Sequence, residues 1–536
     1  MNRPRRLGAV RVVVLVSAVA ASLLSGSVRA SAKTLDVCAA GCPYSQIEPA
    51  VAAATSGDTI EIGRGTYTGG FVITVSVALV GQGPDSTIIR GGGSVITIGT
   101  FGASIEPSVV IKGVRITGGV ARSSPESTPF VGQDGALAMG GGIEIPPNAA
   151  FTGGATVTIS NSEITGNRVA PTRTVPSGLP CPSGQCPFAL AAGGGIDNWG
   201  TLTLTQTTVS DNRVGSASGL STLASDANGA GIMNHLNTLT LNDSHVSDNR
   251  ASATAPNGRF ADSGGIFVEK GALTMTDSWV TGNSAILAAS FPNSVDLLAI
   301  AGGIHIGGTA SATIKRSTIS DNSVSMTNSV GNATAVSGGI HTDVDVRVTD
   351  AVISNNSVRS ATLVGSSGDA EGDSGGGEIS GTISDTRYAD NTVTVSSAAG
   401  QAVALAGAAI IGGSMTNSIV SSNGVHGSSP NGSVFVAGGG LVVAVNLELR
   451  NTTVTDNNGQ ARGLAGRAEG GGIFDSMAPT GPPEGPLTLT ASAVTRNELG
   501  GSEGLMLRGG GVFTTSPVTQ AHSVIAHNSP DQCYGC

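Results

Sequence analysis

Residues 194–212 read Gly-Gly-Ile-Asp-Asn-Trp-Gly-Thr-Leu-Thr-Leu-Thr-Gln-Thr-Thr-Val-Ser-Asp-Asn, and variants of this stretch recur to the end of the chain. Each copy ends on an asparagine, which serves as its anchor. The anchors are Asn167, Asn212, Asn249, Asn283, Asn322, Asn356, Asn391, Asn423, Asn457, Asn497 and Asn528. A single copy cannot bury its apolar side alone, so the repetition predicts a solenoid of stacked coils.

The apolar positions within a copy have the spacing of β-strands. In the quoted copy Leu202 and Leu204 flank a threonine, which is the alternation of a half-buried strand. After a bend, Val209 lies three residues before the anchor, and Ile196 follows the Gly pair. Each copy therefore predicts three short strands joined by corners. At the position of Leu204 every copy is apolar except the last, which has Gln520.

The asparagines and the Gly pairs are interpreted as corner residues. Asparagine is a poor strand former, so its fixed recurrence predicts a left-handed or turn conformation, with side-chain amides bonded from coil to coil. The Gly pair indicates a corner where bulk or a negative φ is excluded. Aspartates that precede several anchors, such as Asp211 and Asp321, are interpreted as turn residues.

The alternation of a Gly-Gly-Ile element with a hydrophobic-x-x-Asn element resembles the repeats of polymorphic outer-membrane proteins. More broadly it resembles the right-handed parallel β-helix of the pectin-lyase-like superfamily, over about residues 44 to 532. The run from Ser56 to Tyr67 is similar to the opening of many such chains. The resemblance implies the fold but no single activity, because the superfamily contains lyases, hydrolases, esterases and adhesins. The chain ends at Cys533-Tyr534-Gly535-Cys536 without the membrane barrel of those outer-membrane proteins, which disfavours autotransport.

Composition agrees with stacked strands and small corners. The 536 residues include 80 glycines, with 3% aromatic and 12% charged residues. The net charge of −10 disfavours a nucleic-acid partner. No interior apolar span is long enough to cross a bilayer, so no transmembrane segment is expected in the mature chain.

Three segments are expected along the chain: a signal peptide at 1–30, an N-terminal cap at 31–56 and the parallel β-helix at 57–536. The first has a basic start, an apolar core and small residues near Ala30; an uncleaved membrane anchor is the alternative. In the cap, Tyr44–Thr55 predicts a helix over the open end of the core. The segments between each anchor and the next Gly pair predict hairpins that project from one edge, with disordered loops as the alternative.

Cysteine usage agrees with export to a secreted or cell-surface location. The six cysteines form three close pairs, and local disulfides are the favoured interpretation. A redox pair or a zinc site is the alternative. The predicted disulfides join Cys38 to Cys42, Cys181 to Cys186, and Cys533 to Cys536.

Side chains after the Gly pairs predict a functional face. The Ile of each copy should point inward, so the next residue and the one two further on should point outward. An outward row of acids, imidazoles and a tryptophan could bind a glycan; the alternative is a solvated sheet with unrelated side chains. The candidate ligand-binding residues are Trp199, Asp197, His235, Glu269 and His305.

The densest cluster of chemically active residues is His341, Asp343, Asp345 and Arg347. A polysaccharide lyase of the superfamily that this chain resembles uses carboxylates to hold Ca²⁺ and a basic residue to remove the proton. These four residues are the candidate catalytic set. Surface pairing of Arg347 with an aspartate is the alternative.

A second candidate is an acidic stretch formed by Asp369, Glu371, Asp373 and Glu378, of which the first three are the candidate metal ligands. Its spacing is similar to that of a Ca²⁺ loop, although the glycine and the terminal glutamate of that loop are missing. We therefore regard it as a candidate metal site, with Ca²⁺ as the only cofactor that the sequence suggests.

Two functions follow from these features. The first is a secreted or surface-associated, non-catalytic protein that binds glycans or other surface partners, or is structural. The second is a lyase or hydrolase of acidic polysaccharides. An enzyme should show outward side chains that converge between walls formed by the inserts, whereas a flat face would count against catalysis.

Overall fold

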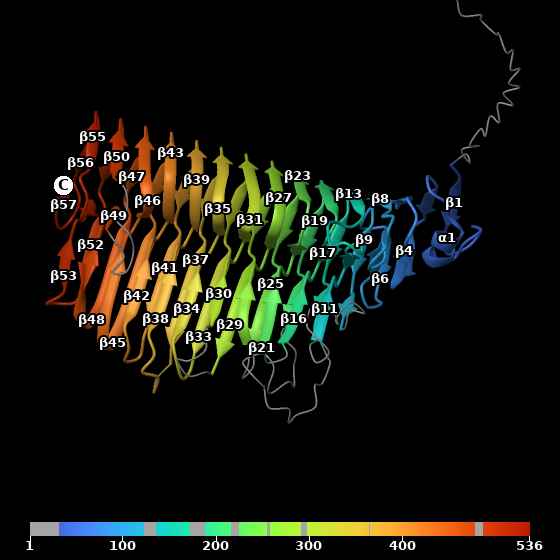
Figure 1. The fold of residues 1–536 in the computed structure, drawn as a ribbon, viewed down its shortest axis with the longest axis horizontal. Coiled ribbons are helices and arrows are strands. Elements are labelled where there is room, and N and C mark those ends of the chain that lie inside the picture. Colours follow the sequence, from blue (N-terminus) through green and yellow to red (C-terminus); the bar gives the residue numbers. More distant parts are fainter. Residues whose placement is uncertain are drawn as a thin grey trace, which may run out of the picture.

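The computed structural model describes residues 32–122, 136–171, 188–215, 224–254, 258–290, 297–363, 365–476 and 486–536. The described chain is an all-β parallel solenoid with a single short helix, which confirms the predicted fold class. Figure 1 shows the coils stacked along one axis, from the N-terminal helix at one end to the C-terminus at the other. The predicted signal peptide lies outside the described residues.

One coil illustrates the architecture. It starts at β31 (Ile304–Lys315), turns into β32 (Thr318–Ser320), and continues through β33 (Ser323–Asn328) and β34 (Ala333–Val336) before β35 (Ile340–Thr349) starts the next coil. β31 pairs in parallel with β35, β32 with β36 (Val352–Ser354), and β33 with β37 (Ser357–Thr362).

Repetition of this coil builds three parallel sheets, which we call A, B and C. In the described chain they contain 23, 14 and 20 strands, respectively. Sheet B has one strand per coil, and its strands that carry the position three residues before an anchor run from β14 (Glu163–Thr165) to β56 (Val524–Ala526). β3 (Gly65–Thr68), β6 (Thr87–Arg90) and β9 (Arg115–Thr117) precede them, as expected for additional N-terminal coils.

Two separate cores run along the rod, the second starting only at Ala121. The main core stacks Ile, Leu and Val from sheets A and B, including the buried Ile304, Ile314 and Ile319. The second core lies between the two arms of sheet C and is built largely of alanine and valine. Small side chains let these two arms approach closely. The resulting flat projection, which we call the fin, lies along the lower edge in Figure 1.

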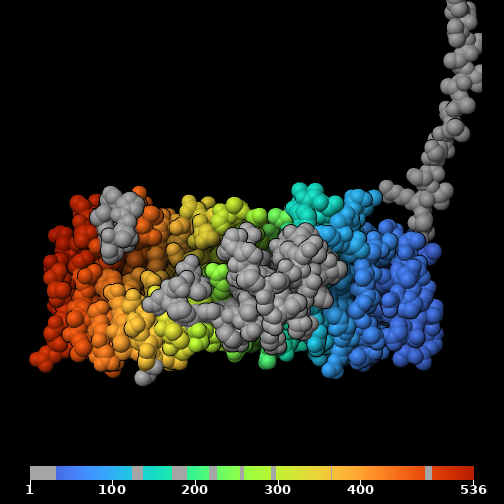
Figure 2. Space-filling model, turned by 60° about the horizontal axis from the view of Figure 1, so that its bottom comes forward, coloured from blue at the N-terminus to red at the C-terminus, as the bar shows by residue number. Residues whose placement is uncertain are grey.

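The fin confirms that the inserts project from one edge, and it also shows how their arms pair. β29 (Ser284–Ala289) pairs in parallel with β33, and β30 (Leu298–Ile300) with β34. Each arm therefore finds backbone partners in the neighbouring coil, while it faces its partner arm through side chains. The coils follow one another along the rod in the view from the fin side (Figure 2).

A ladder of asparagine side chains joins the coils, as predicted. The Asn322 side chain donates to Asn356 Oδ1 at 3.0 Å and to the Val280 carbonyl at 2.9 Å, while its Oδ1 accepts from Asn283 Nδ2 at 3.0 Å. All eleven anchors are buried, from Asn167 to Asn528. Because each buried amide is satisfied, the ladder avoids the cost of an unpaired polar group.

The predicted left-handed conformation of the anchors is wrong by one residue. The residue before each anchor has the positive φ, for example 55° at Asp211 and 58° at Asp321, which supports the interpretation of these aspartates as turn residues. The turn residue takes the left-handed position, so the anchor side chain is free to point into the core.

The Gly pair is required by close approach rather than by φ. A Cβ on Gly303 would lie 2.4 Å from the Gly339 carbonyl oxygen of the next coil and 3.0 Å from the Asn322 amide. A side chain has little room there, and this explains why the Gly pair recurs in most coils where the chain returns from the fin to sheet A; Ala230 and Ala408 each replace one glycine of a pair.

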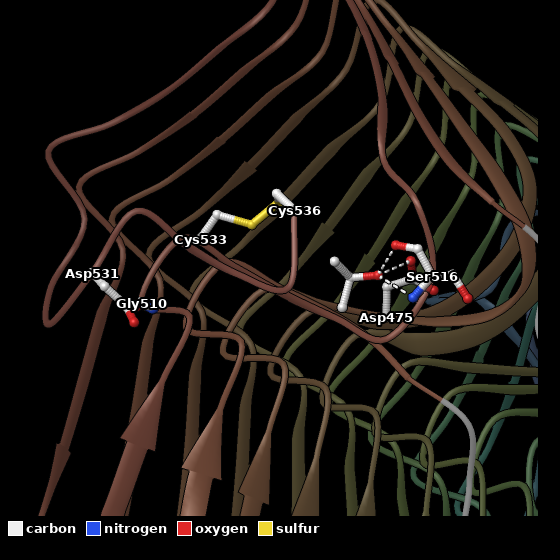
Figure 3. Close-up of a disulfide and its surroundings, with 7 residues drawn as sticks. Asp475, Gly510, Ser516, Asp531, Cys533 and Cys536 are labelled. Atoms are coloured by element: carbon white, nitrogen blue, oxygen red, sulfur yellow. Dashed lines mark hydrogen bonds between the residues drawn. A yellow bond between two sulfur atoms is a disulfide. The ribbon is translucent and has the colours of Figure 1, made fainter.

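The two ends of the described chain are covered by short local structures. Helix α1 (Ile47–Ala53) lies within the predicted 44–55 and buries Ile47, Ala50 and Val51 against the first coils. Disulfides join Cys38 to Cys42 and Cys533 to Cys536, as predicted. At the C-terminal end the disulfide lies close to Asp531, which accepts from the Gly510 amide at 2.8 Å (Figure 3). Cys181 and Cys186 lie outside the described residues.

Within the described residues, no helix has the length and apolar character needed to cross a membrane.

Candidate functional site

The candidate residues lie in the re-entrant corner between the fin and sheet A. In each coil the second fin arm runs into the Gly pair and then into sheet A, so outward side chains on either side of the Gly pair face one another. His305 of β31 contacts Asp262 of β26 (Gly258–Asp262) across this corner, at 2.8 Å. We call the row of outward side chains on both sides of the Gly pairs the corner strip.

The expected external face is wrong in one respect, because much of the corner strip is buried. Asp197 is 1% exposed, His235 4%, His305 6% and Trp199 8%. Apolar side chains from the fin arms cover part of the strip: Leu137, Met139 and Ala192 pack with Met233. The fin, whose arms the sequence placed only at an edge, folds over the residues that follow the Gly pairs.

The first polar cluster is the closed triad, formed by Asp197, His235 and Glu269 on three successive coils. His235 Nε2 lies 3.0 Å from Asp197 Oδ1, and Nδ1 lies 3.0 Å from Glu269 Oε2. Burial alone would lower the pKa of His235, but the two carboxylates outweigh burial and raise it to about 9. Both ring nitrogens are thus occupied by carboxylates within the fold.

Trp199 covers the closed triad and does not form an open platform for a sugar. Its ring stacks on the His235 imidazole, with centroids 4.1 Å apart and planes 13° apart. The cavity between Trp199, Asp197 and the fin residues Leu137 and Met139 measures about 10 Å³. A space of this size holds about one water molecule. The predicted role of Trp199 in stacking on a ligand therefore does not fit its position.

The second polar cluster, the open cluster, consists of His305, His341, Asp343, Asp262 and Glu378. Asp343 lies between the two imidazoles: His341 Nε2 is 3.3 Å from its Oδ1, and His305 Nε2 is 3.6 Å from its Oδ2. The other ring nitrogens face the outer carboxylates, since His305 Nδ1 is 2.8 Å from Asp262 and His341 Nδ1 is 3.3 Å from Glu378.

Electrostatics in the open cluster follow from this arrangement. Burial would lower the pKa of His305, but Asp262 and Asp343 raise it to about 10. Burial acts in the same direction on His341, yet hydrogen bonds to Asp343 and Glu378 raise its pKa above the usual value. The neighbouring imidazoles of His305 and His341 hold the pKa of Asp343 well below its usual range.

A local irregularity of sheet A places Asp343. His341 pairs with Glu378, whereas the next aligned pair joins Asp345 to Ser380, so β35 has two more residues than β39 (Gly377–Ser384) between these points. Such a bulge redirects side chains. Asp343, 46% exposed at its side chain, reaches both imidazoles.

The predicted catalytic set is only partly brought together. His341 and Asp343 meet in the open cluster, together with His305, which the sequence placed among ligand-binding residues. Asp345 and Arg347 lie beyond the bulge on the exposed part of β35. In the described chain neither side chain is ion-paired to the two imidazoles. The bulge separates His341 and Asp343 from Asp345 and Arg347. A regular strand would have kept all four side chains on one face.

The sequence did not single out Asp262, and it assigned Glu378 to the acidic stretch rather than to this cluster. Glu378 occupies the position of His341 one coil later, where the Gly pair is followed by glycine instead of isoleucine, which hid the match. Asp262 lies four residues before Ile266, on the fin arm, where strand alternation also points it outward. The sequence carries no signal that the second fin arm and sheet A face each other, because this depends on the angle of the corner between them.

The acidic stretch does not form the predicted Ca²⁺ loop. Glu371 and Asp373 lie on strand β38 (Ala370–Asp373), and Asp369 immediately before it accepts from the Gln401 amide at 2.6 Å. Alternate residues of a strand lie roughly 6.5 Å apart in a row and cannot surround one ion. Burial, followed by Glu371 and Glu378, raises the pKa of Asp373 well above its usual value.

A shallow depression lies on the outer face of sheet A, beside Asp345. Its volume is about 380 Å³. Gly381 and Gly413 have φ values of 122° and 97°, and a Cβ on either would lie 2.2 Å from the carbonyl oxygen of the preceding coil. These bends open the depression, which is lined by Asp345, Ser380, Gly381, Thr382, Gly412, Gly413, Ser414, Val445 and Asn446.

Comparison with known proteins gives no family and no close relative. No family model and no curated protein matches the chain. Among solved structures, the A-module of the mannuronan C-5 epimerase AlgE6 from Azotobacter vinelandii is 12% identical with a TM-score of 0.29, covering 89% of this chain and 92% of that one. A family 28 exopolygalacturonase from Yersinia enterocolitica is 12% identical with a TM-score of 0.27, and the match covers 94% of this chain and 80% of that one.

The A-module of the epimerase AlgE4 from Azotobacter vinelandii is 13% identical with a TM-score of 0.22, covering 89% of this chain and 93% of that one. Superposition this weak carries no argument about activity. The parallel β-helix of this chain is established by its own strand pairing.

Proposed function

We propose that the chain is an exported, non-catalytic β-helix protein that binds a neutral glycan on the outer face of sheet A. The observation that carries this proposal is the depression beside Asp345. A volume of about 380 Å³ falls within the range of small-ligand sites. Its open shape suits one or two units of an extended chain rather than an enclosed metabolite.

The chemistry of the depression fits a sugar. Asp345 can accept from sugar hydroxyls, Asn446 can both accept from them and donate to them, and Ser380, Thr382 and Ser414 add hydroxyl groups. Val445, 53% exposed, offers an apolar surface to ring C–H groups. The net charge of −10 opposes acidic polymers, so a neutral glycan is the favoured ligand class.

Export is supported by the disulfides. Cys38–Cys42 and Cys533–Cys536 are disulfide-bonded, and such bonds persist in oxidising compartments. A secreted or cell-surface location, an N-terminal signal peptide and a role in adhesion belong to this proposal.

The test is retention of the purified chain on an array of neutral and acidic glycans. Wild-type protein should be retained on at least one neutral glycan. Asp345→Ala and Asn446→Ala should weaken retention at least fivefold, and Glu503→Ala, an exposed acid in another part of the rod, should not. Retention that is insensitive to both substitutions, or no retention on any neutral glycan, would remove this function.

A second candidate, a polysaccharide lyase or hydrolase, is favoured by the open cluster. Its imidazoles and carboxylates converge against the fin, as expected for an enzyme, and Asp343 is exposed at the corner. Against it, Asp345 and Arg347 lie apart from the imidazoles. Release of unsaturated or reducing ends from uronic-acid polymers by the wild type, abolished by Asp343→Ala, would favour the enzyme over the binding protein.

A further inference from the structure

The geometry of the open cluster points to a binding site for one divalent transition-metal ion, with Zn²⁺ as the reference ion, held by His305 Nε2, His341 Nε2 and the Asp343 carboxylate. The ligand atoms of these three residues all lie within 4.8 Å of one another. Two imidazole nitrogens and one carboxylate form the ligand set of many zinc sites with an open fourth position. This inference does not depend on the proposed glycan function.

Distances between the ligand atoms already approach those of a metal site. With Zn–N and Zn–O bonds of about 2.0–2.1 Å and tetrahedral angles, ligand atoms lie about 3.3 Å apart. His341 Nε2 is 3.3 Å from Asp343 Oδ1, and His305 Nε2 is 3.6 Å from Asp343 Oδ2. Because these distances involve different oxygens of Asp343, binding through one oxygen requires small rotations of the carboxylate and of the two rings, which meet edge-on at 71°.

An unpartnered nitrogen indicates where the ion binds. His305 is only 6% exposed, and its Nε2 atom is buried. This atom forms no hydrogen bond, since the nearest carboxylate oxygen, Asp343 Oδ2, is 3.6 Å away. A buried polar atom without a hydrogen bond is rare and requires an explanation. This atom points toward Asp343 and His341, so a cation between the three side chains would satisfy it.

The outer carboxylates orient both imidazoles for metal binding. Asp262 accepts from His305 Nδ1, with its two oxygens at 2.8 and 3.0 Å, and Glu378 lies 3.3 Å from His341 Nδ1. Ser337 Oγ also lies 3.2 Å from His341 Nδ1. With hydrogen on Nδ1, each Nε2 presents its lone pair to the ion, as in carboxylate–histidine–zinc arrangements.

Charge and access also fit a dication. The carboxylates of Asp262, Asp343 and Glu378 surround two imidazoles that are neutral when they bind a metal, so the cluster carries three negative charges. Asp343 and Glu378 are 46% and 38% exposed at their side chains, so the ion has a path from solvent. The fourth ligand position would face this opening and take water.

The test is Zn²⁺ binding by the purified full-length, untagged chain, measured by isothermal titration and by metal analysis after dialysis. The wild type should bind one Zn²⁺ per chain. His305→Ala, His341→Ala and Asp343→Ala should each weaken binding at least tenfold, and Asp262→Asn, which keeps the shape, should weaken it 10–100-fold through loss of orientation. His426→Ala, a half-buried imidazole of the fin, should bind as the wild type does.

Asp343→Ala keeps the test decisive if a histidine variant fails to fold, because Asp343 is at the surface. A circular dichroism spectrum like that of the wild type will establish its fold. Co²⁺ substitution gives a second measurement: visible d–d absorption should appear in the wild type and be lost in Asp343→Ala. No binding of Zn²⁺ by the wild type, or equal binding by Asp343→Ala, would overturn the inference.

Discussion

The closed triad and the open cluster occupy the same corner of the rod, yet they differ in what they leave available. In the closed triad one imidazole is held by two carboxylates at 3.0 Å on both sides and covered by Trp199. In the open cluster two imidazoles share one exposed carboxylate at 3.3 and 3.6 Å. In the closed triad both nitrogens of one imidazole face carboxylates, whereas in the open cluster the Nε2 atoms of two imidazoles on successive coils face the same exposed carboxylate.

The comparison also separates stability from binding. Carboxylates and imidazoles in a fold more often balance one another than act on a ligand. The closed triad has no room for a ligand and no imidazole nitrogen free to bind one, so substitutions there should change the stability of the fold. The open cluster has longer contacts and an opening to solvent, so substitutions there should mainly change the binding of a ligand.

The largest expected effect comes from breaking the closed triad. Asp197→Asn removes a carboxylate that is 1% exposed and leaves the His235 imidazole buried with only Glu269. Removal of one member of a buried pair costs about 3–5 kcal/mol of the free energy of unfolding. Urea unfolding, monitored by circular dichroism, will measure the loss.

Glu378→Gln in the open cluster is the matched change, measured with a chelator present. Because Glu378 is 38% exposed at its side chain, its loss should cost about 1 kcal/mol or less. Equal losses in the two variants would contradict the distinction between a closed and an open cluster.

The second effect is the pH dependence of the closed triad. The pKa of His235 is raised from 6.5 in the unfolded chain to about 9 in the fold. Its stabilising effect is therefore fully present below about pH 6.5 and is lost as pH rises through about 9. A shift of this size corresponds to an effect on the order of 3 kcal/mol.

Unfolding of the wild type and of Asp197→Asn at pH 6, 8 and 10 will test this dependence. The stability difference between the two proteins should be largest at pH 6 and smallest at pH 10. A difference that grows with pH would show that His235 is neutral in the fold.

The smallest effect concerns a corner-strip carboxyl that lacks an imidazole partner. Burial, opposed by Arg259 and assisted by Asp262, raises the pKa of Asp226 to about 6. Since the folded-state pKa lies above the unfolded value of 3.8, ionisation destabilises the fold as pH rises between these values. Asp226→Asn should therefore stabilise the chain at pH 7 by about 1–2 kcal/mol, after a discount for partial exposure.

The same variant should show little gain at pH 3.5, where Asp226 is mostly protonated in both states. Thermal unfolding at the two pH values supplies the measurement and its internal control. Destabilisation at pH 7 would mean that the Asp226 carboxylate is paired in the fold.

The sequence predicts those features of the fold that depend on contacts between equivalent positions of neighbouring coils. The spacing of Leu202, Leu204 and Val209 before Asn212 specifies strands, core and ladder, because each position meets its own counterpart one coil away. The fin arms follow for the same reason, from β-branched and alanine residues repeated at one place in every coil. Periodicity carries this information without any knowledge of long-range folding.

The site depends on angles between elements, which periodicity does not contain. Burial of Trp199 follows from the fin folding over sheet A, and the partnership of His305 with Asp262 requires the two arms to face each other. The bulge that separates Asp343 from Asp345 is a departure from the repeat. Sequence reasoning therefore found His305, His341 and Asp343 but assigned them to different roles.

The most direct test of the distinction between the two clusters is hydrogen–deuterium exchange of the intact chain with and without Zn²⁺. A bound ion should stabilise the strands that supply its ligands against local opening. The account predicts slower exchange in β31 and β35, around His305 and His341, and unchanged exchange in β17 (Ile196–Asn198) and β22 (Ile232–Asn234) beside the closed triad. Exchange that Zn²⁺ leaves unchanged in β31 and β35, or slows equally in all four strands, would contradict it.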